Sequence, residues 1–380
     1  MNLSNIYSKL AYFVFRGYGL VHPIQKKVVF SSFFGKQYSD NPRAICEKMH
    51  ELYPDYELVW LLNNKENELI PDYVRIVAQS DGIFAWGKEI TTAASYVYNV
   101  EIKTRIFRKK QQSFIQTWHG DRGVKKILKQ RNPSLEMYDH KLTTLCVAGS
   151  EFGKNLYHSA FGYYGHIMES GCPRNDCLIV KTESKKIETK KRLGIPQDCK
   201  VLLYAPTFRD NAKDKPQICN INIVRTLDSF PSNENWVCLI RAHVASAGIE
   251  EKHTDKRIYN VTSYPDMADI LGITDCLITD YSSCAMDFAI TGRPLILALF
   301  DKEEYERDCR EFSSDPVAAG FVIAYNQAEL EEKIQTVSLI EYEEANKRVN
   351  NYYGVVETGH SAEDVCEYID SFYRENNKSK

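Results

Sequence analysis

Short runs of apolar residues alternate with amphipathic stretches along most of this 380-residue chain. Runs such as KVVFSSF, YELVWLL, KVLLYAPT, DCLITD and PLILAL have the length of buried strands, whereas NPRAICEKMHELY has its apolar residues at helical spacing. Further helices are expected around residues 87–97 and 220–230. Strands that alternate with helices favour parallel sheets built from βαβ units. The pattern therefore predicts an α/β protein.

The length predicts more than one domain, because single hydrophobic cores stop growing at roughly 250–300 residues. Two series of strands and helices are separated by a segment with a charged helix that ends at Leu193–Gly194. We expect two Rossmann-like lobes whose strand ends face a common cleft. The predicted boundaries are an N-terminal amphipathic segment (1–27), a first lobe (28–170), a second lobe (171–325) and C-terminal helices (326–380).

The N-terminal segment has an apolar face at helical spacing, and the two interpretations of this face stay open. Its members are Leu3, Ile6, Tyr7, Leu10, Phe13 and Val14. Such a face either packs on the protein or lies in a membrane interface. The longest apolar runs fall far short of the ~20 residues that cross a bilayer, so no spanning helix is expected. A signal peptide is not predicted either, because the segment lacks a small-residue cleavage site.

The overall charge of the chain is nearly balanced, but one segment is strongly basic. With 48 basic and 51 acidic residues the net charge is −3, which argues against a nucleic-acid binder that works by bulk charge. Residues 101–131, however, contain ten basic and two acidic residues. This basic belt is either a solvated surface or a binding face.

The eleven cysteines are dispersed and form no CxxC motif. An odd number of cysteines, several of them in apolar runs, is typical of reduced thiols in a cytoplasmic protein. The sequence predicts no metal site and no cofactor.

The candidate chemistry lies where predicted strands end. The predicted strand Cys276–Thr279 is followed directly by Asp280, Tyr281, Ser282 and Ser283, at the start of a helix. Hydroxyls and free N–H groups at such a start favour phosphate oxygens, while plain helix capping is the alternative. The stretch has neither the GxGxxG motif of a dinucleotide site nor the lysine of a P-loop.

Two more strands in the second lobe end on polar residues. WVCLIRAH ends on Arg241 and His243, and VLLYAPTFRDN ends on Thr207 and Arg209. Open α/β sheets bind ligands at the carboxyl ends of their strands. Together with Asp280–Ser283, these residues predict a site for a phosphate-bearing ligand.

In the first lobe SFIQTWHG ends on His119 and is followed by Lys125 and Lys126. Taken alone, a histidine at such a position is more often a packing residue at a turn than a functional one.

The motifs together resemble the CDP-glycerol glycerophosphotransferase family of teichoic-acid and related polysaccharide synthesis. FGKQYSDNPRAI, QTWHG, YAPTFRDN, RAH, SYPDMADIL and ITDYSSCAMDF occur in this order, and the resemblance covers roughly residues 28–370. It implies a GT-B fold, with the CDP-alditol donor in the second lobe and the acceptor entering from the first.

Carried over by position, His119 is the expected base for the acceptor hydroxyl. His243, Ser282 and Ser283 are expected to hold the donor diphosphate. Substrate-binding residues are also expected among the remaining motif positions, which are Thr207, Arg209, Arg241, Asp280 and Lys125. The resemblance implies transfer of glycerol phosphate to a lipid-linked glycan or polysaccharide at the cytoplasmic membrane surface, with release of CMP.

Two departures from the family pattern leave alternatives open. Asp121–Arg122 stands where the family commonly has Thr-Pro, and Val244 stands where it commonly has Pro. CDP-ribitol is therefore an alternative donor. A GT-B glycosyltransferase that uses a nucleotide sugar, and a non-catalytic scaffold at the membrane surface, are the other interpretations.

Overall fold

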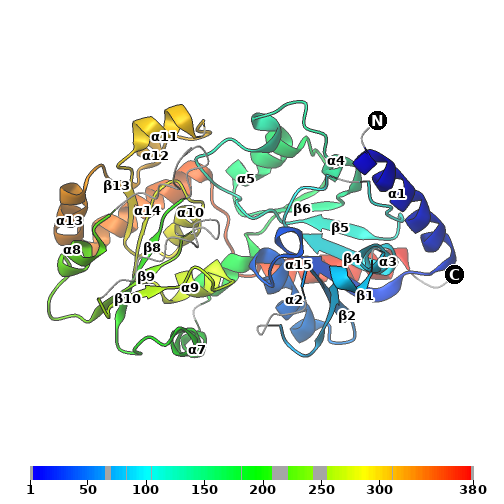
Figure 1. Cartoon of the computed structure of the whole chain (residues 1–380), viewed down its shortest axis with the longest axis horizontal. Coiled ribbons are helices and arrows are strands. Elements are labelled where there is room, and N and C mark those ends of the chain that lie inside the picture. Colours follow the sequence, from blue (N-terminus) through cyan, green and yellow to red (C-terminus); the bar gives the residue numbers. More distant parts are fainter. Residues whose placement is uncertain are drawn as a thin grey trace. The chain divides into compact units, whose positions relative to one another are not determined.

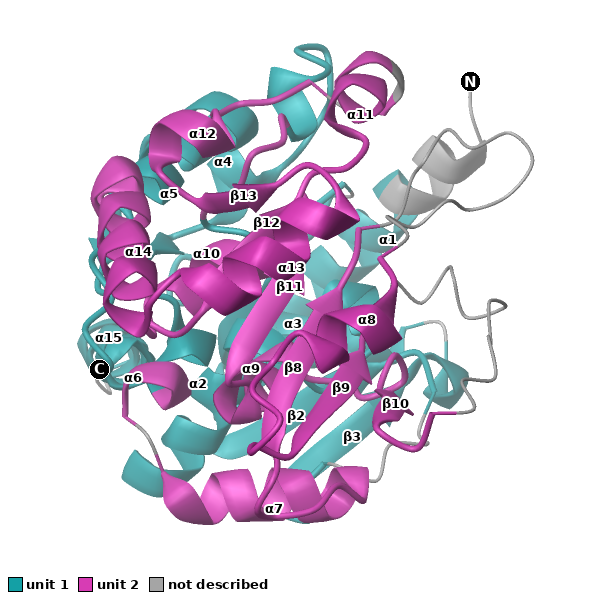
Figure 2. Cartoon of the chain, turned by 90° about the vertical axis from the view of Figure 1, so that its left-hand side faces the viewer, with its two compact units in different colours: residues 1–121, 127–176, 356–380 teal, residues 122–126, 177–355 magenta. Residues whose placement is uncertain are grey.

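A computed structural model describes residues 3–64, 70–82, 84–103, 105–180, 182–207, 221–242, 255–309 and 311–377. Contacts divide the chain into two compact units (Figure 2). Unit 1 comprises residues 1–121, 127–176 and 356–380, and unit 2 comprises residues 122–126 and 177–355. Each unit has its own parallel sheet, which confirms the predicted α/β class.

The sheet of unit 1 has seven strands in the order β3-β2-β1-β4-β5-β6-β7 (Figure 1). The strands are β1 (Gln25–Ser31), β2 (Glu57–Leu62), β3 (Val74–Ala78), β4 (Ala93–Tyr98), β5 (Ser113–Gln116), β6 (Leu145–Ala148) and β7 (Ile167–Glu169). Val29 of β1 pairs with Val59 on one side and Tyr96 on the other, both in parallel register. The inner strands are apolar almost throughout because helices cover both faces of a parallel sheet.

The sheet of unit 2 has six strands in the order β10-β9-β8-β11-β12-β13. The strands are β8 (Lys200–Ala205), β9 (Trp236–Ile240), β10 (Ile258–Asn260), β11 (Cys276–Thr279), β12 (Leu295–Ala298) and β13 (Val322–Ala324). Within each unit the strand order reverses beside the first strand, as in a doubly wound fold. Ligands of such sheets bind outside the carboxyl ends of the strands at this switch point.

The helices of unit 1 include the N-terminal helix and the last helix of the chain. They are α1 (Leu3–Val21), α2 (Asp40–Leu52), α3 (Ala85–Thr92), α4 (Asp139–Leu142), α5 (Glu151–Leu156) and α15 (Ser361–Asn376), with short turns η1 (Phe33–Gly35), η2 (Gln79–Asp81), η3 (Leu128–Gln130), η4 (Tyr157–Phe161) and η5 (Pro173–Asn175).

The helices of unit 2 follow α6 (Asp176–Ile179), where the chain passes from one unit to the other. They are α7 (Glu183–Leu193), α8 (Ile223–Asp228), α9 (Met267–Ile273), α10 (Cys284–Ala289), α11 (Lys302–Asp308), α12 (Pro316–Ala319), α13 (Gln327–Thr336) and α14 (Leu339–Tyr353).

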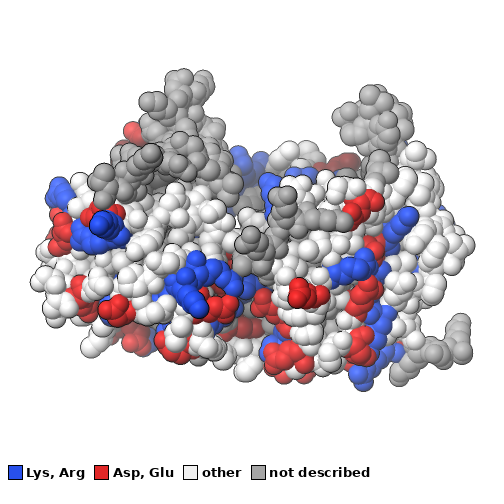
Figure 3. All heavy atoms as spheres, turned by 60° about the horizontal axis from the view of Figure 1, so that its bottom comes forward, with Lys and Arg blue, Asp and Glu red and all other residues white. Residues whose placement is uncertain are grey.

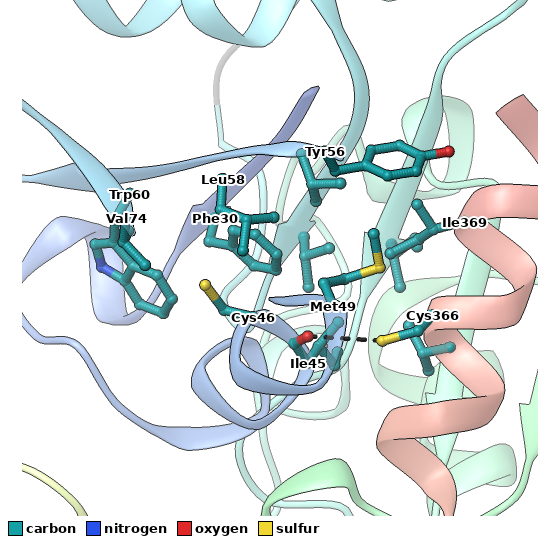
Figure 4. Close-up of a cluster of buried hydrophobic side chains, with 14 of the residues drawn as sticks. Phe30, Ile45, Cys46, Met49, Tyr56, Leu58, Trp60, Val74, Cys366 and Ile369 are labelled. Carbon is teal, nitrogen blue, oxygen red and sulfur yellow. Dashed lines mark hydrogen bonds between the residues drawn. The ribbon is translucent and has the colours of Figure 1, made fainter. Parts of the chain in front are cut away.

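Residues 326–380 are divided between the two units, with residues 326–355 in unit 2 and residues 356–380 in unit 1. Helix α15 packs on α2, where Met49, Cys366 and Ile369 are buried together (Figure 4). The phenol of Tyr56 donates a hydrogen bond to Asp370 Oδ1 at 3.1 Å. Helices α13 and α14 belong to unit 2 instead. The contacts thus divide residues 326–380 differently from the sequence-based boundaries, because the apolar face of α15 completes the core of unit 1.

One predicted element is wrong. The expected helix around 87–97 is helix α3 followed directly by strand β4, which lies at the centre of its sheet. The stretch AASYVY begins with three small residues and ends with three larger ones, and all six are buried. Burial on both faces of a central strand outweighs the helical propensity of its alanines.

Helix α1 packs through one face and exposes the other. Phe15 lies so close to Gly87 of α3 that a Cβ there would approach its ring within 1.9 Å. Exposed residues of the opposite face include Leu10, Phe13, Val14, Leu20 and Val21. Among the described residues, no helix is both long enough and apolar enough to cross a membrane.

Charged side chains are mixed rather than segregated on the face shown in Figure 3, where Lys and Arg lie among Asp and Glu. Several cations of the basic belt have partners within the protein. Lys103 pairs with Glu101 at 2.6 Å, and Lys126 pairs with Glu311.

Candidate active site

In unit 1 three neighbouring strands end around His119. Strand β1 leads into η1, β4 is followed by Asn99, and β5 is followed by Thr117, Trp118 and His119. Strands β1, β4 and β5 are adjacent and parallel, so these residues gather at one edge of the sheet. The edge includes the switch point between β1 and β4.

The imidazole of His119 is held through one of its two nitrogens. Nδ1 lies 2.7 Å from the carbonyl oxygen of Asn99. A carbonyl oxygen can only accept, so Nδ1 carries the hydrogen in the neutral ring and the lone pair lies on Nε2. This is the tautomer that a general base requires.

Burial keeps this ring neutral. It lowers the pKa of His119 below the ordinary value of 6.5, and the hydrogen bond to Asn99 opposes that shift. The charges of Asp40 and Arg174 act on the same pKa with opposite signs. At neutral pH the imidazole is therefore available to accept a proton.

Asn99 also fixes the loop that covers the histidine. Its Oδ1 accepts from the backbone N–H of Phe33 at 2.9 Å, and its Nδ2 donates to Ser32 Oγ at 3.0 Å. The Phe33 ring lies 5.2 Å from the His119 ring. Phe33 and Trp118 both have positive φ angles, of 47° and 49°. Backbone strain of this kind persists where surrounding contacts hold it and is concentrated at functional sites.

Asp121 and Arg122, which stand in place of the family's Thr-Pro, make contacts in different units. The carboxylate of Asp121 accepts from Gly149 N at 3.1 Å and from Ser150 Oγ at 2.6 Å, within unit 1. Arg122, whose side chain is fully buried, pairs with Asp287 of α10 at 3.4 Å, within unit 2. The chain therefore passes between the units directly after the His119 loop.

In unit 2 Thr207 and Asp280 meet at the switch point, since β8 and β11 are neighbours. The backbone N–H of Thr207 donates to both carboxylate oxygens of Asp280, at 2.8 and 3.1 Å. The N–H of Tyr281 donates to the same carboxylate at 2.6 Å. Asp280 thus fixes the two loops to one another, and a role toward substrate stays a prediction.

Ser282 and Ser283 lie between that carboxylate and α10. The N–H of Cys284 lies 3.4 Å from Ser282 Oγ, and the side chain of Ser283, the N-cap residue, makes no capping hydrogen bond. Both residues are partly exposed. This geometry weakens the interpretation that the serines are present only to cap the helix.

The structure gives Arg241 and Lys125 contacts within the protein. The guanidinium of Arg241 donates to the carbonyl oxygens of Tyr264 and Pro265, and burial lowers its pKa. Lys125 Nζ lies 5.6 Å from the ring centre of Tyr305, which stacks on Tyr281 at 3.8 Å. Segment 122–126 therefore packs beside the TDYSS motif.

Two predicted site residues, Arg209 and His243, lie outside the described residues. Where the structure does describe the chain, no group of three or more His, Cys, Asp or Glu side chains could hold a metal ion.

Sequence reasoning missed Asn99, the residue that orients His119. The signal was present, because Asn99 directly follows an apolar run, as the other candidates do. The helix predicted around residues 87–97 hides this signal, because Asn99 then follows a helix and not a strand.

The family described as CDP-glycerol:poly(glycerophosphate) glycerophosphotransferase matches residues 16–371. The chain belongs to this family of transferases. It is 31% identical over 324 residues to a teichoic acid poly(glycerol phosphate) polymerase of Bacillus spizizenii, covering 80% of this chain and 81% of the relative. It is 27% identical over 367 residues to a teichoic acid glycerol-phosphate transferase of Staphylococcus aureus, covering 91% and 93%.

A solved structure of the wall teichoic acid polymerase TagF has a TM-score of 0.83 to this chain. It is 24% identical, and the likeness covers 98% of this chain and 96% of that one. At this identity the likeness shows the fold, which is GT-B-like as expected. The family predicted from the motifs is confirmed.

Proposed function

We propose that this enzyme transfers glycerol phosphate from CDP-glycerol to a hydroxyl of a lipid-linked glycan or polysaccharide and releases CMP. Family membership supports the donor class. The observation that carries the proposal for the chemistry is the tautomer of His119, with Nδ1 hydrogen-bonded to Asn99 and the lone pair on Nε2.

His119 then acts on the acceptor. Nε2 takes the proton of the acceptor hydroxyl as the oxygen attacks the phosphorus that carries glycerol. The phosphoanhydride bond to that phosphorus breaks, and CMP leaves with the bridging oxygen. A positioned base of this kind contributes about 10²–10⁴-fold to the rate.

The donor phosphates need positive or hydrogen-bonding groups, because negative charge moves onto CMP in the transition state. We assign this role to the hydroxyls of Ser282 and Ser283, together with Arg209 and His243, which the sequence predicts to follow strands of the same sheet. Asp280 supports them by holding the loop after β8 against the end of β11 through three backbone hydrogen bonds.

We further propose that α1 brings the enzyme to the cytoplasmic leaflet, where a lipid-linked acceptor lies. Leu10, Phe13, Val14, Leu20 and Val21 form one exposed stripe at helical spacing. The helix packs beside Phe107 and Lys109, which brings basic residues of the belt near its C-terminal end. Near an anionic leaflet each such cation contributes about 1 kcal/mol.

A donor panel tests the proposed reaction. The purified protein is incubated with membranes and with CDP-glycerol, CDP-ribitol or a nucleotide sugar, and the released nucleotide is identified. CMP released from CDP-glycerol, with label transferred to the membrane fraction, supports the proposal. Preference for CDP-ribitol makes the enzyme a ribitol-phosphate transferase. Release from a sugar donor makes it a glycosyltransferase, and binding without turnover makes it a scaffold.

A further inference from the structure

Unit 2 contains a cavity that the proposed transfer does not use. Helices α6, α7 and α9 line it, and it opens to solvent. Its interior of about 100 Å³ is several times the roughly 10–15 Å³ that one water molecule needs, so a small metabolite can enter.

This cavity lies at the opposite edge of the sheet from the donor candidates. Two of its wall residues, Asp275 and Arg293, stand just before β11 and β12, whereas Asp280–Ser283 follow β11. Strand β11 has four residues, which corresponds to roughly 13 Å. The cavity is thus separated from the switch point by the length of a strand.

Charged groups dominate the wall. The wall contains three cations, which are Lys185 and Lys186 of α7 and Arg293. It also contains two carboxylates, which are Asp269 of α9 and Asp275. The wall therefore carries one net positive charge.

Both carboxylates are engaged within the protein. Asp269 pairs with Lys185 at 3.3 Å and accepts from the phenol of Tyr264 at 3.1 Å. Asp275 accepts from the backbone N–H of Val201 at 2.8 Å. Lys186 pairs with Glu183 of its own helix at 3.5 Å, and the charge of Asp275 acts to raise the pKa of Arg293.

Arg293 is held by carbonyl groups. Its Nη1 donates to the carbonyl oxygens of Gly272 and Thr274, and its Nη2 donates to that of Leu271 at 3.0 Å. Its Nε is buried and has no hydrogen-bond partner among the described residues. Burial lowers the pKa of Arg293 to about 10, so it stays a cation at neutral pH. Carbonyl dipoles orient this charge without cancelling it.

We propose that the cavity binds a small phosphorylated polyol. The phosphate group lies toward Arg293 and Lys186, since guanidinium and ammonium groups are the usual partners of phosphate oxygens. The hydroxyl groups donate to the carboxylate of Asp275, which is partly exposed and accepts from the backbone N–H of Val201. A carboxylate can accept at about four positions, so this contact leaves room for further hydrogen bonds.

Cys177 provides a reporter inside the cavity. It lines the wall and is partly exposed. Every other described cysteine is buried except Cys309, which is also partly exposed and does not line the cavity. Modification of each thiol of the full chain by a maleimide can be followed by peptide mass spectrometry. Cys309 then serves as an internal control.

Glycerol 3-phosphate is the probe. At ten times its Kd it is expected to slow modification of Cys177 about tenfold while the rate at Cys309 stays unchanged. Glycerol lacks the phosphate group and inorganic phosphate lacks the polyol, so each should protect Cys177 less at equal concentration. CDP-glycerol at a concentration that saturates the donor site should leave the rate unchanged, so the result does not depend on the proposed transfer.

A matched pair of variants on α7 completes the test. Lys186→Ala should weaken protection about tenfold or more, because a charge-assisted hydrogen bond is lost. Lys191→Ala, on the same helix but outside the cavity wall, should leave protection unchanged. The proposal is overturned if glycerol 3-phosphate does not protect Cys177, if Cys309 is protected equally, or if the two variants behave alike. Equal protection by inorganic phosphate would overturn the polyol part.

Discussion

A single hydrogen bond sets the chemistry of His119. The carbonyl oxygen of Asn99 lies 2.7 Å from Nδ1 and places the lone pair of the neutral ring on Nε2, while burial favours the neutral ring itself. A base must be neutral to accept a proton. Under the proposed mechanism, activity is therefore lost at acid pH as His119 becomes protonated.

We expect kcat/KM to stay level as the pH falls to 6.5, the ordinary pKa of histidine, and to decline only below it. The sign follows from burial, which lowers the pKa and so extends the neutral form to lower pH. Initial rates with CDP-glycerol between pH 5 and 8 provide the measurement. A decline that begins well above pH 6.5 would contradict the assigned environment.

Ser282 and Ser283 are expected to bind the donor. Replacing both with Ala should weaken CDP-glycerol binding more than tenfold, since each hydrogen bond to a charged oxygen is worth about 1.5–3 kcal/mol. Calorimetric titration measures this affinity. Thr291→Ala, another partly exposed hydroxyl of the same unit, is the control. Unchanged affinity in the double variant would contradict donor binding by these serines and leave helix capping as their role.

For single residues, the sequence pattern predicts the candidate site residues but not the residues and backbone groups that hold them in place. His119, Thr207, Arg241 and Asp280 all follow strands, which an apolar run with a polar end reveals. Asn99 does not stand out in this way, because the sequence pattern predicts a helix before it. The carbonyl contacts of Arg241 could not be foreseen, because they depend on where the loop at Tyr264 lies after folding.

At the scale of elements, the short segment 122–126 is held by specific contacts within unit 2. Arg122 reaches Asp287 of α10, and Val124 O accepts from Ser313 N at 2.6 Å. Helix α10 begins directly after Ser282 and Ser283. The segment that follows His119 in the chain therefore supports the helix beside the donor candidates.

Removing the buried cation should loosen α10. Breaking a buried ion pair from one side costs about 3–5 kcal/mol, so Arg122→Met should speed amide exchange in residues 284–289. Lys126→Met removes an exposed pair in the same segment, worth about 0–1 kcal/mol, and should leave exchange there unchanged. Hydrogen exchange with mass spectrometry makes the comparison. Equal amide exchange in the two variants would show that Arg122 does not stabilise α10.

Periodicity predicted most elements because their burial patterns are regular. Helix α7 ends at Leu193 before Gly194, whose φ of 68° suits a C-cap glycine, as expected. It failed at β4, where a central strand looks helical in composition. It also could not assign α15 to unit 1, because the partners of that helix on α2 lie more than 300 residues earlier in the chain.

At the scale of the whole molecule, the exposed stripe of α1 carries the proposal of membrane contact. Phe13 and Leu20 are 63% and 77% exposed. Burying a large apolar side chain is worth about 1.5–3 kcal/mol, so replacing both with Ser should weaken flotation with anionic liposomes more than tenfold. High salt should weaken it further by screening the nearby cations.

Leu339 and Ile340 provide the control, because they are 72% and 70% exposed on α14. Their replacement with Ser should leave flotation unchanged. If the wild-type protein does not float, or if both pairs of substitutions have equal effects, α1 does not hold the protein at the membrane.

The passage of the chain between units could not be predicted at this scale. Residues 122–126 leave unit 1 and the chain returns at residue 127, although the local sequence has no linker composition. Such a crossing is decided by contacts such as those of Asp121 and Arg122, each of which needs a partner from a distant segment.

The most direct test of the account is transfer by a His119→Gln variant. Labelled glycerol phosphate incorporated into membrane acceptor, with one CMP released per transfer, is measured for this variant and the wild type beside calorimetric CDP-glycerol affinity. We expect a loss of turnover of about 10²–10⁴-fold with donor affinity preserved. Near-normal turnover in the folded variant, or a loss explained entirely by weaker donor binding, would contradict it.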